Sequence, residues 1–114
     1  MKVGIDVSIF LTDGGAVGNV AGDADFSVPP AVGDTISFTS PRDGVRRSLP
    51  PSFTGVLKVK DRVLVANETA TLLLALNSIV VDNMDAANAV VDYLEEGFGL
   101  FFTPYITPGP SRSK

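Results

Sequence analysis

Apolar and polar residues alternate along the first segment of the chain. One side of this alternation consists of Val3, Ile5, Val7, Ile9 and Leu11. A period of two residues predicts a β-strand with one buried face. The sequence Asp13-Gly14-Gly15 follows it and is typical of a tight turn, because glycine adopts positive φ without strain. We therefore expect a second extended segment within residues 17–28.

The middle of the chain predicts two further strands with a long loop between them. Pro29-Pro30 interrupts the strand pattern, and a short strand is expected over 35–39. Residues 40–52 contain three prolines and three arginines, which predicts a loop that is either functional or mobile. An extended segment is expected over 55–66. Its apolar face consists of Leu57, Val59, Val63 and Val65, and its polar face of Lys58, Lys60 and Arg62.

Asp61 falls on the apolar face of that segment, and a β-bulge near Asp61-Arg62 would turn its carboxylate outward. The following segment, 71–82, is extended and aliphatic, so the two segments should form a long antiparallel hairpin. Apolar residues in 72–76 and 79–81 do not alternate, which indicates that both faces of this strand are covered.

An amphipathic helix is predicted from about residue 84 to 96. Asp82 or Asn83 can cap its N-terminus, and Gly97 or Gly99 can end it. The apolar stripe at helical spacing consists of Ala87, Val90, Val91 and Leu94. Residues 100–106 then predict a short closing strand, and the Pro/Ser/Arg-rich tail 107–114 is expected to be disordered.

These elements predict an α+β fold in a single domain, residues 1–106. We expect five or six antiparallel strands that form a strongly bent sheet or a small, partly open barrel. The C-terminal helix would pack against this sheet. At 114 residues such a domain can be held by a hydrophobic core without metals or disulfides.

Composition narrows the chemistry that is available. The chain has no cysteine and no histidine, which excludes disulfides, thiolate nucleophiles and Ser-His-Asp or Cys-His triads. Asp6 and Ser8 interrupt the segment where a secretory signal needs an apolar run, and no apolar run is long enough for a transmembrane helix. We expect a cytoplasmic protein that does not contact a membrane.

Charge is segregated along the chain. The formal net charge is −4, from 9 basic and 13 acidic side chains. Residues 42–62 carry six basic and two acidic side chains, so this segment has a charge of +4 and the remainder a charge of −8. The six basic residues, which are the candidates for binding an anion or a nucleic-acid backbone, are Arg42, Arg46, Arg47, Lys58, Lys60 and Arg62.

A simpler interpretation is that these basic residues keep a loop and a strand solvated, and we favour it. Aromatic side chains that would stack on bases are not interleaved with the charges, because only Phe38 and Phe53 flank them. Nucleic acid is therefore a possible but not a favoured partner.

Carboxylates supply no convincing metal or catalytic motif. Asp23 and Asp25 lack the further ligands of a calcium loop, and helix capping explains Asp82 with Asp85. Neither glycine-rich phosphate-binding motif is present. We therefore name no catalytic residues, no metal ligands and no cofactor.

The apolar surplus near the C-terminus is the remaining candidate. The second face of the aliphatic strand and a cluster of aromatic residues need shelter, which either a partner subunit or the interior of a closed barrel could provide. The interface candidates are Leu72, Leu74, Leu76, Phe98, Phe101, Phe102 and Tyr105.

Three functional hypotheses follow. The leading one is a small non-catalytic module for protein–protein interaction or assembly, associating with copies of itself or with another protein. The second is binding of an anion or nucleic acid through residues 42–62. The third, which ranks last, is an enzyme that uses carboxylates and lysine. The sequence identifies no biological process.

Overall fold

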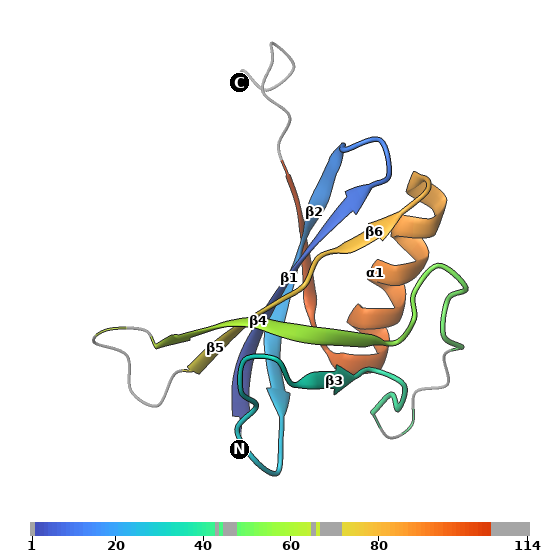
Figure 1. Cartoon of the computed structure of the whole chain (residues 1–114). Helices are drawn as coiled ribbons and strands as arrows, with labels where there is room; N and C mark the ends of the chain where they lie inside the picture. The colour runs from blue at the N-terminus through green and yellow to red at the C-terminus, as the bar shows by residue number, and fades with distance from the viewer. Residues whose placement is uncertain (1, 43, 45–47, 65, 67–71, 106–114) are drawn as a thin grey trace, which may run out of the picture.

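The fold combines one sheet with one helix, as the α+β prediction requires (Figure 1). The computed structural model describes all residues except 1, 43, 45–47, 65, 67–71 and 106–114. The predicted disordered tail, 107–114, therefore lies outside the described residues. The elements are β1 (Lys2–Leu11), β2 (Ala16–Asp25), β3 (Thr35–Ser37), β4 (Val56–Leu64), β5 (Leu72–Leu76), β6 (Ile79–Val81), α1 (Met84–Phe98) and β7 (Phe101–Pro104).

The β1–β2 hairpin is the longest pairing in the sheet and confirms the first prediction. The two strands are antiparallel and meet at the predicted glycine turn, where Gly14 has a φ of 95°. The Gly15 N–H donates to Asp13 Oδ1 at 2.7 Å, so this backbone donor finds its acceptor within the turn itself. Every second residue of β1, from Val3 to Ile9, is buried.

The strand order is β3-β4-β5-β1-β2-β7, and β6 pairs with β1 beside β5. The prediction of five or six antiparallel strands was wrong in two respects, because the described residues contain seven strands and both β5 and β6 run parallel to β1. Hydrophobic periodicity shows which residues are buried, but it carries no information on which distant strand lies alongside or in which direction. The sheet is not closed into a barrel.

The predicted long strand over 71–82 is divided. Asn77 and Ser78 separate β5 from β6, and both pieces lie along β1. The Asn77 N–H donates to the carbonyl of Lys58, so the chain turns toward β4 at this break.

The predicted bulge is present in β4, where Val59 pairs with Leu76 and Asp61 with Ala75. Lys60 is therefore the extra residue, and Asp61 is exposed as expected. The bulge also reverses the facing of every residue after it.

Helix α1 covers one face of the sheet, which we call the inner face. The Asn83 side chain accepts the Ala86 N–H at 2.8 Å, and Gly99, with a φ of 72°, ends the helix. The structure thus selects Asn83 and Gly99 from the predicted alternatives, and the helix ends at Phe98 rather than near 96. The four residues of the predicted apolar stripe are all buried.

An aromatic cluster joins the helix to the connection between β3 and β4. The rings of Phe38, Phe53, Tyr93 and Phe98 lie within 5.3 to 6.5 Å of their neighbours in the cluster, measured between centroids. The Tyr93 hydroxyl donates to the carbonyl of Phe38. Burial raises the pKa of Tyr93 above its usual value, because ionisation would place a charge in an apolar environment. The hydroxyl therefore remains a donor.

Candidate interaction surface

Arg42, the first of the predicted basic residues, is used by the fold. Its backbone N–H donates to the Gly97 carbonyl at 2.8 Å, and its Nε donates to the Glu96 carbonyl at 3.1 Å. The last turn of a helix leaves carbonyls without partners inside the helix, so this arginine stabilises the C-terminus of α1. Arg46 and Arg47 lie outside the described residues.

The other basic residues are exposed along β4, but they do not form one row. Lys58 lies before the bulge, on the face opposite the buried Val59. After the bulge Arg62 pairs with the fully buried Leu74, and partners across a sheet share a face. Arg62 therefore belongs to the inner face and Lys58 to the other, contrary to the predicted common polar face.

Most of the predicted interface residues are accounted for by the protein's own core. Leu72, Leu74 and Leu76 are buried on the inner face. Phe98 belongs to the aromatic cluster, and Phe102 is half-buried. We therefore do not carry these five residues into the interface proposed below.

Phe101 and Tyr105 differ from the other predicted interface residues because they are exposed. Phe101 is 72% exposed and pairs with Ala21 across the β2–β7 ladder. The Tyr105 hydroxyl lies 2.8 Å from the Ser8 hydroxyl, on the side of β1 that points away from the core. Both residues therefore point to the side of the sheet opposite α1.

This second side, the outer face, can be mapped from the strand register. A Cβ added to Gly4 would lie 3.2 Å from the Leu73 side chain and 3.8 Å from Asp23 Oδ1, so these three residues share the outer face. The same alternation assigns the rest of it. The outer face consists of Lys2, Gly4, Asp6, Ser8 and Phe10 of β1; Asn19, Ala21, Asp23 and Asp25 of β2; Lys58, Asp61 and Val63 of β4; Leu73 and Ala75 of β5; Val80 of β6; and Phe101 and Thr103 of β7.

The outer face mixes apolar and acidic side chains. Val63 and Val80 join Phe101 among its exposed apolar residues, and Val80 is 53% exposed. Its charged residues are four aspartates and two lysines, Lys2 and Lys58. The Asp6 carboxylate accepts a hydrogen bond from the Asn19 side chain near the middle of the face. An apolar surface with this excess of carboxylates suits a partner that is apolar and basic.

The arm, which we define as residues 60–64 of β4, is a second exposed surface. All five residues are exposed, so neither face of this part of the strand is covered. Leu64 is 78% exposed and, like Arg62, lies on the inner side because it pairs with Leu72. Figure 1 shows this end of the β4–β5 hairpin projecting from the body on the side away from the 40–55 connection.

Edge strand β7 is protected against the addition of another strand. In the ladder with β2 the Tyr105 N–H donates to the Val17 carbonyl, so the N–H groups of residues 102 and 104 point to the open edge. The Phe102 N–H donates to Glu95 Oε2 at 3.0 Å, and residue 104 is proline. Association through this edge is therefore disfavoured.

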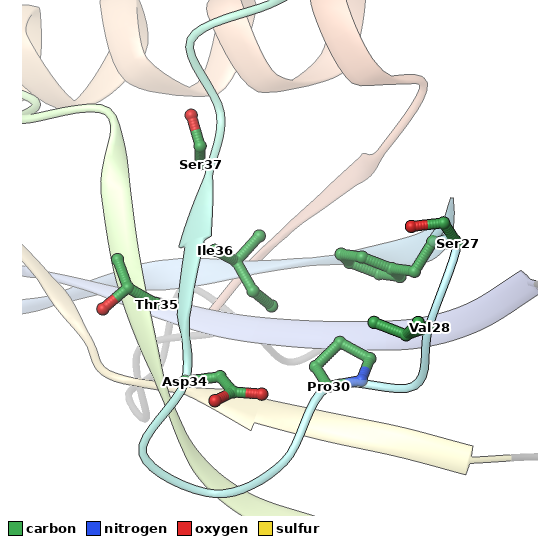
Figure 2. Close-up of a pocket in the computed structure, with 8 residues that line it drawn as sticks. Ser27, Val28, Pro30, Asp34, Thr35, Ile36 and Ser37 are labelled. Atoms are coloured by element: carbon green, nitrogen blue, oxygen red, sulfur yellow. The ribbon is translucent and has the colours of Figure 1, made fainter.

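Two pockets of similar size lie at the ends of the bent β3–β4 unit. The first, of about 360 Å³, is formed by residues 26–30 and β3. Figure 2 shows Ile36 and Val28 facing each other across it, while Thr35 points to the other side of the strand. Asp34 is the only charged residue that lines it, and Asp34 Oδ2 accepts the Ala31 N–H at 2.8 Å. The lining of this pocket therefore contains an acidic side chain but no basic side chain that could act together with it.

The second pocket, of about 330 Å³, lies between the start of β4 and the β5–β6 break, and Lys58 is the only charged residue in its lining. In the part of the chain that the structure describes, no three acidic side chains are grouped so that they could hold a metal ion. Within those same residues, no helix combines the length and the apolar character that crossing a bilayer requires.

Sequence reasoning missed three exposed apolar residues: Val63, Leu64 and Val80. Simple alternation along the strand places Val63 on the buried face, but the bulge before Asp61 reverses the side on which the residues beyond it lie. Val80 was included in a strand covered on both sides, but it pairs with Phe10 on the outer face. The predicted bulge is sufficient to place Val63 on the outer face. Only the pairing of β6 with β1 reveals Val80.

The chain was compared with models of known protein families, with curated proteins and with solved structures, and none of the three comparisons found a match.

Proposed function

We propose that this protein is a non-catalytic assembly module that associates with copies of itself through the outer face of its sheet. The observation that carries the proposal is that three exposed apolar residues, Phe101, Val63 and Val80, lie on the one face of the sheet that α1 does not cover. Exposed apolar residues that share one face of a sheet are typical of interaction surfaces, whereas single ones are ordinary.

Charge supports association with another copy rather than with an unrelated protein. The positive charge of this chain is concentrated in residues 42–62, and the rest of the chain is acidic. Each copy therefore carries both of the complementary charges that an interface needs, and complementary charge favours specific encounter.

Replacement of Phe101 by aspartate tests the proposal. The aromatic ring contributes on the order of 1.5–3 kcal/mol when it is fully buried, so Phe101→Asp should weaken self-association on the order of ten- to a hundredfold. Light scattering over a concentration series measures the change, and circular dichroism checks that the variant remains folded.

Val32→Asp is the matched control, because Val32 is 58% exposed but lies in the β2–β3 connection rather than on the outer face. It should associate like the wild type. Equal loss of association in both variants, or no loss in Phe101→Asp, would contradict the assignment of the interface to the outer face.

A further inference from the structure

The arm has the properties of a segment that binds a partner rather than of a segment that supports the fold. Its inner side presents Arg62 and the 78%-exposed Leu64 beyond the end of the covered core, and Lys60 adds a second positive charge at the bulge. Asp61, the one acidic residue of the arm, lies on the opposite side. The inner side of the arm is therefore apolar and basic.

The outer face has the complementary character. Asp23 and Asp25 are exposed at the end of β2, and Asp23 lies in the same row as the apolar Leu73. The basic residues that the described strands place on this face are Lys2, which pairs with Asp25, and Lys58, which lies before the bulge of β4. A basic, apolar strand can thus find both carboxylates and apolar contacts there.

We infer that the arm of one copy docks, by its inner side, on the outer face of a second copy. This inference rests on the proposed self-association and specifies its geometry. Arg62 and Lys60 pair with the aspartates of the neighbour, and Leu64 covers apolar residues of the neighbour's outer face. The partner is a second copy of this chain because one chain contains both surfaces.

Charge also decides between two ways of using the outer face. Packing two outer faces against each other would bring the four aspartates of one copy toward those of the other, and like charges at an interface are repulsive. Docking of the arm pairs opposite charges instead. Since the arm and the outer face are different surfaces, the contact is head-to-tail, and repeating it gives a ring or an open chain.

The test reverses the charges of each surface separately. The arm variant is Lys60→Glu with Arg62→Glu, and the face variant is Asp23→Lys with Asp25→Lys. Each should associate at least about tenfold more weakly than the wild type, as measured by light scattering, because attractive pairs become repulsive. Asp92→Lys, on the exposed side of α1, reverses one charge outside both surfaces, so it is the control and should leave association unchanged.

Mixing the variants gives the sharpest result. In a head-to-tail contact, each variant keeps one normal surface. The arm variant keeps a normal outer face, which its own reversed arms do not bind. The face variant keeps a normal arm. An equimolar mixture should therefore recover association, because the normal arm meets the normal face, and the reversed arm, now acidic, meets the reversed face, now basic. Leu64→Ser, which leaves the charges unchanged, should also weaken association.

The outcomes separate this inference from the proposed function. Full assembly of the arm variant, together with dissociation of Phe101→Asp, would overturn arm docking and leave association through the outer face intact. A wild-type protein that remains monomeric would overturn both. Failure of the mixture to associate, when both variants are folded, would contradict the head-to-tail contact.

Discussion

Tyr93 places a hydroxyl group inside an otherwise apolar core. Its side chain is 1% exposed, and its hydroxyl is bonded to the carbonyl of Phe38, which lies far away in the sequence. This bond joins the helix to the connection after β3, where regular backbone pairing ends. No polar side-chain atom that is buried in the described residues lacks a partner, so this core tolerates a hydroxyl only where it is bonded.

The raised pKa of Tyr93 predicts how stability depends on alkaline pH. The folded state favours the protonated hydroxyl, so its stabilisation is fully present below the unfolded pKa of about 10 and is lost as the pH rises through the folded pKa. Tyr93→Phe should remove this part of the alkaline decline in the free energy of unfolding. Near neutral pH it should cost about 1–3 kcal/mol, because the Phe38 carbonyl loses its donor.

Denaturant unfolding between about pH 8 and 11 measures both effects, since this range brackets the ordinary tyrosine pKa. Tyr105→Phe is the matched control, because Tyr105 is exposed. The same alkaline decline in Tyr93→Phe as in the wild type would show that burial of this hydroxyl does not contribute to it.

Helix α1 is the element that the sequence predicts most completely. Its apolar stripe, its start and its glycine end all follow from local rules, and coordinates were needed only to choose Asn83 over Asp82 as the cap and Gly99 over Gly97 as the end. Asn83 has extended backbone angles and accepts the Ala86 N–H, whereas no such bond is recorded for the Asp82 side chain.

The cap can be tested directly. Asn83→Ala should lower the free energy of unfolding by about 1 kcal/mol, because the Ala86 N–H loses its acceptor. Asp82→Ala, one position earlier and equally exposed, should have a much smaller effect in the same denaturant titration. If the two substitutions cost the same, the cap has been assigned to the wrong residue.

The strands were less predictable than the helix for a physical reason. Alternation identified β1, β4 and a bulge near Asp61-Arg62, which the structure places at Lys60, because these features depend on neighbouring residues. The parallel placement of β5 and β6 along β1 depends on contacts between residues more than 65 positions apart. Local patterns do not encode such contacts. The sequence therefore predicts that some apolar surface needs shelter, but it does not predict which face of the sheet is exposed.

At the scale of the whole molecule, the bulge connects the fold with the proposed self-association, because it decides which side chains each face of the sheet presents. Because it reverses the facing of β4, it moves Arg62 and Leu64 to the inner side and Val63 to the outer side. The predicted stripe of basic residues along one face is thereby divided. The candidate site changes from a patch that could follow a nucleic-acid backbone to an arm and an acidic face that complement each other.

The mass of the wild-type protein in solution tests the central claim most directly. Light scattering over a concentration series at low salt should give a mass above that of the 11.9 kDa chain, which decreases on dilution and on addition of salt as the charge pairs are screened. A mass of 11.9 kDa at every concentration would contradict self-association through the outer face.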